Sequence, residues 1–192
     1  MGGSILFLVV GGIVGVFAVL VFVAIYNGLV GKKNAVEQAF SGIDTSLKKR
    51  YDLIPNLVET VKNYMQHERE TLTQLTELRS KALSGGLSAA ERVDVDNQIT
   101  RGISGIMVSV ESYPDLKANQ NFLQLQDSLT KIEGEISGAR KAFNQTTTEY
   151  NNSVETIPSN LVAMVVGYKR RPLFEITEAE RKNVDVGQLF KR

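Results

Sequence analysis

The sequence has no cysteine, no tryptophan and a single histidine, His67, among its 192 residues. Because cysteine is missing, disulfide bonds, thiolate metal sites and a cysteine nucleophile are excluded, and the redox compartment is left undetermined. No second histidine stands at ligand spacing, so we expect His67 to be a solvated helix residue and predict neither a metal nor a cofactor. A strong charge of one sign is also missing, since the formal net charge is +1, which gives no reason to expect nucleic acid as a partner.

Charged side chains are absent from the first 31 positions. Within this stretch, residues 5–25 read ILFLVVGGIVGVFAVLVFVAI, and as a helix they would span about 31 Å, which matches the apolar core of a bilayer. A secretory signal peptide is disfavoured because the segment has no basic region before it and no A-x-A cleavage site after it. We therefore predict a transmembrane anchor over residues 1–31.

The residues at the edge of this anchor predict its orientation. Lys32 and Lys33 follow it directly, whereas only the α-amine precedes it, so the amino terminus should lie outside and the carboxy-terminal domain in the cytoplasm. Tyr26 is typical of the interfacial aromatic belt. Gly11 and Gly15 have the spacing that lets membrane helices approach closely, although glycine is also simply common in membrane helices. We take these two glycines as candidate contacts between copies of the chain.

Beyond the anchor, apolar residues recur three or four positions apart. From Val36 to Leu78 they predict one helical stripe, which Gly85 and Gly86 end. A second stripe follows, and a third predicts a helix of about 35 residues that stops at Pro158. No segment alternates apolar and polar residues for long, so we predict no β structure. The fold class is all-α: the transmembrane helix, then an antiparallel four-helix bundle of long helices over residues 32–171, then a tail over 172–192.

The fourth predicted helix, residues 161–168, is apolar on every side, and a helix of this kind is normally covered all round. The sequence leaves three possibilities for what covers this helix: the bundle core, a neighbouring subunit, or the headgroup region of an anionic membrane. We take Leu161, Met164, Val165 and Tyr168 as candidate contacts between subunits.

One proline lies inside the first predicted helix, in RYDLIPNLVETV (residues 50–61). The apolar spacing continues from Leu47 to Val58 through Pro55, so we expect the helix to bend there rather than to end, at a cost of about 3 kcal/mol. The alternative is that Pro55 begins a new helix, since its missing N–H costs nothing in a first turn.

Three stretches resemble the LemA family of bacterial membrane proteins: residues 26–68 with the RYDLIPNLVETV motif, residues 113–144 with YPDLKAN, and YN followed by IPSNLVAM. The similarity reaches from the anchor to about Glu175. It implies a bundle of four main helices behind an amino-terminal anchor. It implies no activity, because the family has no agreed biochemical role, but links of the wider family to the cell envelope and to magnetosome membranes imply membrane organisation as a theme.

Several polar residues lie beside the apolar stripes: Asp44, Arg50, Asp52, Asn56, Asn119, Asn121, Arg140 and Asn144. They have the chemistry of an acid/base site, but paired helices also use Arg and Asp to fix their register, and we favour this structural role. Asp115, after Tyr113 and Pro114, is expected to stabilise the turn and to cap the next helix. We therefore predict no catalytic, cofactor-binding or metal-ligating residue.

The expected function is that of a non-enzymatic protein of the bacterial inner membrane, single-pass, which self-associates as a scaffold or organiser. Its expected partners are the lipid bilayer, further copies of the chain and a membrane-protein partner. One alternative is a signalling or adaptor module that docks a membrane protease or kinase. Another is a hydrolase that uses the region of Asp52 and Arg140.

Overall fold

The computed structural model describes residues 2–87 and 89–174. Every regular element in them is a helix, as predicted, and no strand is found in this part of the chain. The elements are α1 (Gly2–Val61), the 3-10 turn η1 (Gln66–Glu68), α2 (Arg69–Leu83), α3 (Ala89–Ser109), the 3-10 turn η2 (Val110–Ser112), α4 (Pro114–Lys117), α5 (Gln120–Glu155) and α6 (Ser159–Val165).

The chain divides into two compact units. The central unit is Gly42–Gly138, and the terminal unit combines Met1–Ser41 with Ala139–Arg192. Helices α1 and α5 each contribute a segment to both units. Of the predicted tail over 172–192, all but the first three residues lie outside the described part of the chain.

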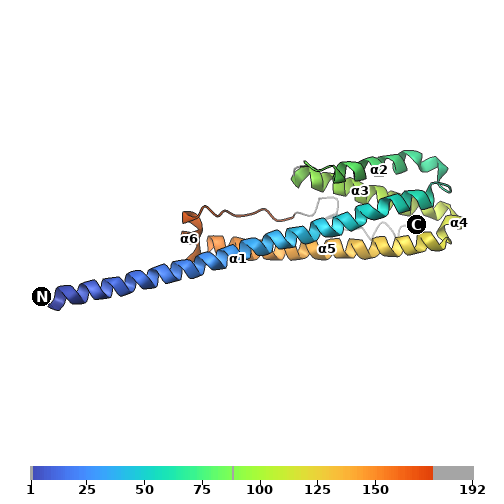
Figure 1. The fold of residues 1–192 in the computed structure, drawn as a ribbon. Coiled ribbons are helices and arrows are strands. Elements are labelled where there is room, and N and C mark those ends of the chain that lie inside the picture. The colour runs from blue at the N-terminus through green and yellow to red at the C-terminus, as the bar shows by residue number, and fades with distance from the viewer. Residues whose placement is uncertain (1, 88, 175–192) are drawn as a thin grey trace, which may run out of the picture. The chain divides into compact units, whose positions relative to one another are not determined.

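Helix α1 continues for 60 residues and includes Pro55 (Figure 1). Pro55 therefore does not begin a new helix, which was the alternative left open by the sequence. Ile54 and Leu57, on either side of it, are almost completely buried, so packing of the helix offsets the hydrogen bond that the proline ring removes.

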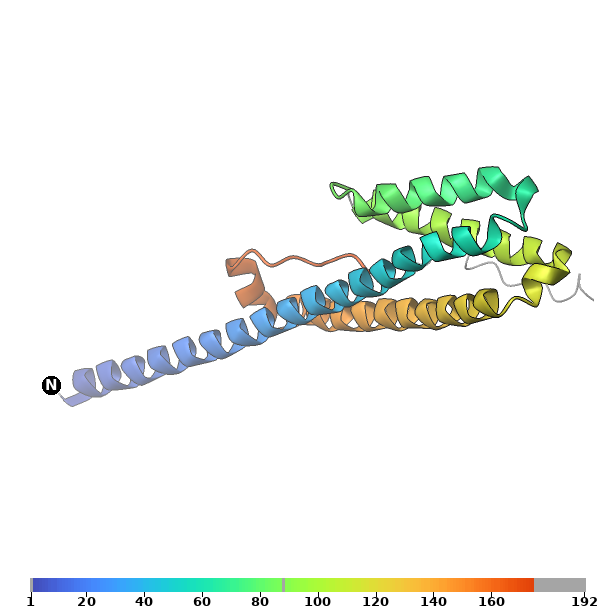
Figure 2. The ribbon, with the colours of Figure 1, turned by 45° about the vertical axis from the view of Figure 1, so that its right-hand side comes forward.

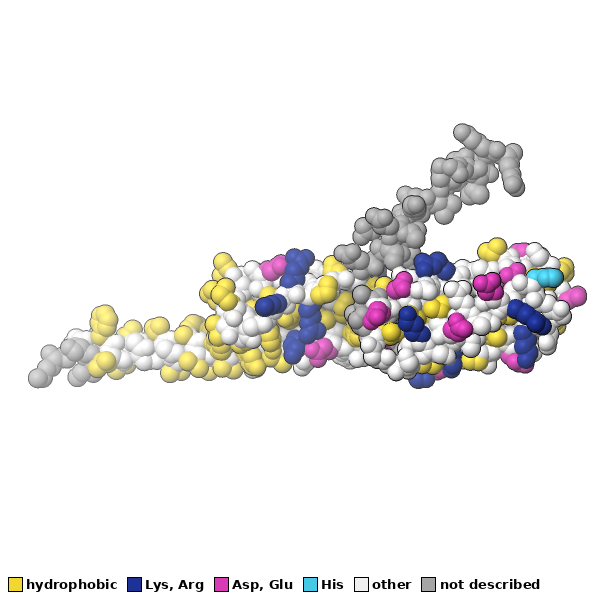
Figure 3. Space-filling view, turned by 90° about the horizontal axis from the view of Figure 1, so that it is seen from above, with side chains coloured by type: hydrophobic (Ala, Val, Ile, Leu, Met, Phe, Trp, Pro, Cys, Tyr) yellow, Lys and Arg dark blue, Asp and Glu magenta, His cyan; other side chains and the backbone are white. Residues whose placement is uncertain are grey.

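The amino-terminal part of α1 presents an apolar surface that the rest of the described chain does not cover. Phe7, Leu8 and Phe17 are between 66% and 85% exposed, and Figure 3 shows yellow side chains along this part of the helix and dark blue ones only further along the chain. Among the described residues, α1 is the one helix that is long and apolar enough to cross a membrane. Lipid is the environment in which such a surface is stable.

The predicted single stripe from Val36 to Leu78 is wrong as one helix, because α1 ends at Val61 and α2 begins only at Arg69. The backbone N–H groups of Tyr64 and Met65 both donate to the Val61 carbonyl, at 3.0 and 2.9 Å, and close a turn. Val61 and Met65 are fully buried on the two sides of that turn. The apolar spacing therefore continues across the turn, and periodicity alone does not reveal it.

Helices α2 and α3 lie side by side in the central unit, in both ribbon views (Figures 1 and 2). The turn between them contains Gly85 and Gly86 at φ of 75° and 77°, a conformation that glycine adopts without strain, so the predicted helix stop is confirmed. The buried apolar residues of this unit are Ile43, Leu47, Tyr51, Ile54, Leu57, Val61, Met65, Leu72, Leu75, Val95, Ile99, Ile106, Val110, Leu116, Phe122, Leu125, Leu129, Ile132 and Ile136.

The start of α5 corrects one prediction. The Asn119 side chain accepts hydrogen bonds from the N–H groups of Asn121 and Phe122, at 2.9 and 3.2 Å, and so caps the helix. Asp115 instead lies in the first turn of α4, behind Pro114, and makes no capping bond there. The short α4 ends at Lys117, so Asp115 lies about one turn before Asn119, the residue that caps α5. The predicted length of α5 is confirmed, since it has 36 residues.

Helix α6 is shorter than the predicted 161–168. It ends at Val165, and Gly167 follows with φ of 74°. The Tyr168 N–H donates to the Ala163 carbonyl at 2.9 Å and the Gly167 N–H donates to the Met164 carbonyl at 3.3 Å, which is the paired bonding of a Schellman C-cap. The helix therefore stops at this glycine cap and leaves out the last three predicted residues, 166–168.

Candidate functional site

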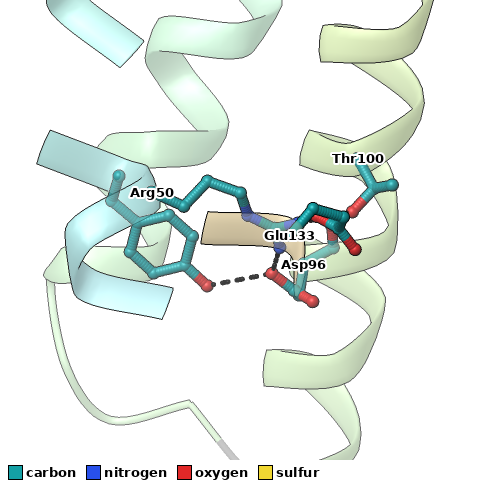
Figure 4. Close-up of polar contacts among 5 residues, drawn as sticks. Arg50, Asp96, Thr100 and Glu133 are labelled. Carbon is teal, nitrogen blue, oxygen red and sulfur yellow. Dashed lines mark hydrogen bonds and ion pairs between the residues drawn. The ribbon is translucent and has the colours of Figure 1, made fainter. Parts of the chain in front are cut away.

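The strongest polar cluster of the central unit surrounds Arg50 of α1, whose side chain is only 2% exposed. Its guanidinium donates to Asp96 of α3, to the Thr100 hydroxyl at 3.0 Å and to the Glu133 carboxylate of α5 at 2.9 Å (Figure 4). The Tyr51 hydroxyl also lies 3.4 Å from the Asp96 carboxylate. One arginine thereby joins three helices of the unit.

The burial of this cluster decides what it does chemically. Arginine stays protonated in proteins, so Arg50 supplies a fixed positive charge and does not act as an acid that gives up a proton. Asp96 is as buried as Arg50, whereas the Glu133 side chain is 51% exposed and still reaches water. A buried cation and a buried carboxylate satisfy each other's charge, and the geometry fixes the register of α1 against α3 and α5.

A surface pocket of about 310 Å³ lies beside this cluster. Its lining residues are Arg50, Thr100, Ile103, Ser104, Met107, Gln126, Leu129, Thr130 and Glu133. The only carboxylate on its wall, Glu133, is already paired with Arg50. The hydroxyl groups of Thr100, Ser104 and Thr130 lie on the same wall, and the Thr100 hydroxyl is held by Arg50 as well.

Three further contacts tie neighbouring helices to α1 in the central unit. Arg92 of α3 pairs with Asp44 at 2.8 Å, and Lys49 pairs with Glu135 of α5 at 2.8 Å. The Arg79 side chain of α2 donates to the Tyr51 carbonyl at 2.8 Å. These exposed or half-buried contacts surround the buried one at Arg50.

Asp52 and Asn56, two further residues of the proline motif, bond within α1 itself. Asp52 is exposed and pairs at 2.7 Å with Lys48 on its own helix. This corrects the expected seam role of Asp52, because two residues along a helix turn the side chain to the far side from Arg50. Asn56 is also exposed, and its carbonyl accepts a bond from the Thr60 hydroxyl at 2.7 Å.

Asp96, Thr100 and Glu133 were missed from the sequence, although a signal for Asp96 exists. Asp96 precedes buried Ile99 by three residues, and Arg50 follows buried Leu47 by three residues. Each charged residue therefore occupies a position on an apolar face. Two opposite charges at core positions predict a buried ion pair.

In the terminal unit, two asparagines of α5 hold the segment that follows α6. The Asn151 amide donates to the Arg171 carbonyl at 2.9 Å and accepts from the Arg171 N–H at 2.8 Å. The Asn144 amide makes the same two bonds with Phe174, at 2.9 and 2.7 Å. Each side-chain amide therefore donates one hydrogen bond to a backbone residue and accepts one from it, as a residue of a neighbouring β-strand does. We call residues 171–174 the strap.

The spacing of this pairing is set by helix geometry. Two turns of helix, about 10.5 Å, separate the two asparagines, and three extended residues cover about 10 Å. The strap runs antiparallel to α5, because the later asparagine holds the earlier strap residue. Asn144 was among the polar residues noted from the sequence, whereas Asn151 was missed, since the strap has no periodic pattern.

Aromatic and charged side chains complete the hold on the strap. The Arg140 guanidinium lies 4.8 Å from the ring centroid of Phe174, and that of Arg171 lies 5.6 Å from the ring of Tyr150. Arg171 also pairs with Glu37 of α1 at 3.1 Å. Burial raises the pKa of the Tyr150 hydroxyl above its ordinary value, against the lowering effect of Arg171.

The residues at the edge of the anchor face α5 and α6. The Lys32 ammonium donates to the Ser153 hydroxyl at 2.5 Å. Lys33 lies 3.9 Å from the Glu37 carboxylate and 5.7 Å from the ring of Tyr168, which is half-buried. Tyr26, on the last turn of the apolar run, is 38% exposed.

Of the candidate contacts between copies, Tyr168 is half-buried against the Leu29 cluster, and the others are open in the single chain. A Cβ at Gly11 or Gly15 would meet no heavy atom within 4 Å. Leu161, Met164 and Val165 are 59% to 76% exposed. In the residues described, no group of three or more His, Asp or Glu side chains is placed to hold a metal ion.

Comparison of the sequence with known proteins finds a family and several relatives. A sequence profile of the LemA family matches residues 39–187. The chain is 29% identical to a protein named Protein LemA from Metamycoplasma hominis, over 92% of this chain and 80% of that protein. It is 22% identical to Magnetosome protein MamQ 2 of Paramagnetospirillum magneticum, over 93% of this chain and 76% of that protein. Magnetosome protein MamQ of Magnetospirillum gryphiswaldense is also 22% identical, over 86% and 70%.

Proposed function

Because the chain belongs to the LemA family and carries an apolar helix long enough to span a bilayer, we propose that it is a non-enzymatic membrane organiser that acts as an assembly of copies. The observation that carries the proposal is the continuity of α1. One helix includes both the uncovered apolar surface and the buried Arg50 that joins three helices. The part of the chain in lipid and the part in water are thus built on one helix.

The proposed architecture is an antiparallel four-helix bundle behind a single membrane anchor of the bacterial inner membrane. The amino terminus lies outside and the remainder of the chain in the cytoplasm. Lys32 and Lys33, directly after the apolar run, support this orientation through the preference of basic residues for the cytoplasmic side. The relatives named as magnetosome proteins support a role in organising membranes rather than in one reaction.

A non-enzymatic role is supported by the way the buried charges are used. Arg50 and Asp96 are satisfied by each other and by Thr100, and the exposed Glu133 is paired as well. These groups fix helix register in the unit where an active site would need them free. Nucleic acid is not among the proposed partners, which are the bilayer, further copies of the chain and a membrane-protein partner.

Self-association is supported by the face of α1 that carries Gly11 and Gly15. Nothing in the described part of the chain requires glycine at these positions, since a Cβ would meet open space at both. Small residues at this spacing let the backbones of two membrane helices approach closely, which strengthens dispersion contacts and weak hydrogen bonds between them. A second copy of α1 is the partner that would use this face.

The absence of cysteine makes a direct test simple. Ala18→Cys places a single thiol close to the face of Gly11 and Gly15, and Leu20→Cys places one at nearly the same depth but on the opposite side, since each residue turns a helix by about 100°. In oxidised native membranes we expect disulfide-linked dimers for Ala18→Cys and not for Leu20→Cys. Equal crosslinking of the two variants, or none in either, would contradict association through this face.

A further inference from the structure

The outer face of α6 is an apolar surface of the terminal unit that the described chain leaves open. Ile157, Leu161, Met164 and Val165 are 77%, 59%, 76% and 75% exposed. Leu161, Met164 and Val165 follow helical spacing and therefore share one side of α6, whereas Ile157 lies in the turn before the helix. A group of large exposed apolar side chains on one helix face marks a site of contact with another molecule or with a membrane.

The inner face of α6 is held firmly against the anchor helix. Val162 and Ala163 are 5% and 1% exposed and pack with Leu29 of α1, with Ile25 at the edge of the contact. Val154 of α5 packs against the same cluster. Helix α6 is therefore docked on α1 through one side, and its outer face points away from that contact.

The connections at both ends of α6 keep it in place. It follows α5 after only a few residues, and the Schellman bonds around Gly167 close its carboxyl end. The strap then begins at Arg171, which Asn151 holds through two backbone hydrogen bonds. The exposed apolar face therefore belongs to a fixed element and not to a frayed end.

The contact with Ile25 and Leu29 places α6 at a defined depth. Ile25 is the last residue of the 21-residue apolar run, which is as long as the apolar core of a bilayer is thick. Leu29 is one turn further, about 6 Å along the helix axis. A helix docked on these two residues lies at the boundary between acyl chains and headgroups, where amphipathic helices insert an apolar face by about 5–10 Å.

The charges around α6 fit anionic headgroups. Lys169 and Arg170 follow its C-cap and are exposed, and Lys32 and Lys33 lie on the next turn of α1 after Leu29. Among the described residues, two carboxylates pair with this group, Glu155 with Arg170 and Glu37 with Lys33. Basic residues at this level are attracted to the negative surface of the cytoplasmic leaflet.

We propose that α6 is a membrane foot, a short helix that lies in the headgroup region of the bilayer spanned by α1 and inserts Leu161, Met164 and Val165 toward the acyl chains. The covering molecule is lipid rather than a second copy of the chain. The open face of α6 has three large apolar side chains, whereas a stable protein interface needs roughly 20–30 residues on each side. The proposal rests on membrane anchoring by α1, and it does not depend on self-association.

The experiment uses tryptophan, which the chain lacks. Full-length Met164→Trp, Val108→Trp and Phe17→Trp variants are reconstituted in vesicles of phosphatidylcholine and phosphatidylglycerol, with or without lipid brominated on the upper acyl chain. Val108 of α3 is the matched control, because its exposure of 73% is close to the 76% of Met164. Phe17 lies in the anchor and reports whether α1 is inserted.

We expect Met164→Trp to emit at shorter wavelength than Val108→Trp and to lose intensity in brominated lipid, as Phe17→Trp does, while Val108→Trp is unchanged. If Phe17→Trp is quenched and Met164→Trp is not, the membrane foot is overturned and the anchor stands. A blue shift of Met164→Trp without quenching also overturns it, because protein then covers the face. Failure of Phe17→Trp to be quenched would overturn the anchor itself.

Discussion

The central and terminal units are both held together by polar side chains, but they use different chemistry. The central unit buries a full charge pair, Arg50 with Asp96, and links it to α5 through Glu133. The terminal unit uses two neutral amides, Asn144 and Asn151, on the backbone of a non-helical segment. In the central unit whole helices are joined, and in the terminal unit one strap is attached.

This difference determines how each unit responds to a loss. Removing one member of a buried ion pair leaves the other charged and without a partner, at a cost of about 3–5 kcal/mol. Removing an amide loses bonds of about 1 kcal/mol each, and the freed backbone groups of the strap can reach water. We therefore expect global unfolding effects in the central unit and local opening in the terminal unit.

The largest effect is expected for Arg50→Met. It leaves the buried Asp96 carboxylate unpaired, so the free energy of unfolding should fall by about 3–5 kcal/mol. For a chain of this size that lowers the midpoint of thermal unfolding by about 10 °C, measurable by circular dichroism of the full chain in detergent.

Two variants serve as controls for this prediction. Arg50→Met combined with Asp96→Leu removes both charges and should regain most of the loss, since an apolar pair can replace a buried ion pair. Asp52→Asn breaks only an exposed ion pair and should change stability by less than about 0.5 kcal/mol. Equal destabilisation by Arg50→Met and Asp52→Asn would show that the buried cluster does not hold the unit.

The next largest effect is expected for Asn151→Ala. Two hydrogen bonds to Arg171 are lost, worth about 2 kcal/mol together, and the strap should open without unfolding of α5. Hydrogen exchange of the strap amides should then accelerate by about tenfold or more. Asn152→Ala, an exposed neighbour on the same helix, should leave the exchange unchanged. Acceleration in both variants would mean that the amide pairing is not what holds the strap.

A smaller effect, of about 1 kcal/mol, is expected at Gly167. An alanine there is strained at φ of 74°, although its Cβ meets no neighbour within 4 Å, so Gly167→Ala should destabilise the chain. Gly138 lies inside α5 and is also in open space, so Gly138→Ala should stabilise the chain, since alanine is the better helix former. Thermal unfolding of the two variants separates these effects, and a shift in the same direction for both would refute the assigned backbone strain.

The smallest effect concerns alkaline pH. Folding raises the pKa of Tyr150 through burial, so its contribution to stability is fully present below the ordinary tyrosine pKa of about 10. That contribution is lost as the pH rises through the higher folded pKa. Stability of the native chain should therefore fall more steeply above about pH 10 than that of Tyr150→Phe, as measured by denaturant unfolding at each pH. Parallel curves would exclude Tyr150 as a source of the dependence.

Much of the helical architecture was predictable from local pattern. The apolar anchor follows from composition, the length of α5 from the spacing of its apolar residues, and the helix stop at Gly85 from the backbone freedom of glycine. Each of these signals acts within a few residues. The turn after Val61 was not predictable in this way, because Val61 and Met65 are buried on both sides of it and keep the helical spacing. The spacing of apolar residues shows which face of a segment is buried, but it does not show whether one helix continues through the segment.

The polar contacts were predictable only in part, because their partners lie far apart in the chain. Arg50 was noted beside an apolar stripe, but Asp96 and Glu133 are 46 and 83 residues further along. Asn151 pairs with backbone groups, which carry no sequence signal. Which polar residues meet depends on how the helices pack, and a single sequence does not contain that information.

Polar contacts hold the helices within each unit, and in the terminal unit apolar surfaces of α1 and α6 stay open in the described chain. The central claim, that it acts as an assembly of copies, is tested most directly by native mass spectrometry of the full chain released from nanodiscs with room for several copies. We predict a mass of two or more 21.2 kDa chains, which falls to one when Gly11 and Gly15 are both replaced by leucine. A mass of one chain for the unmodified protein would contradict the claim.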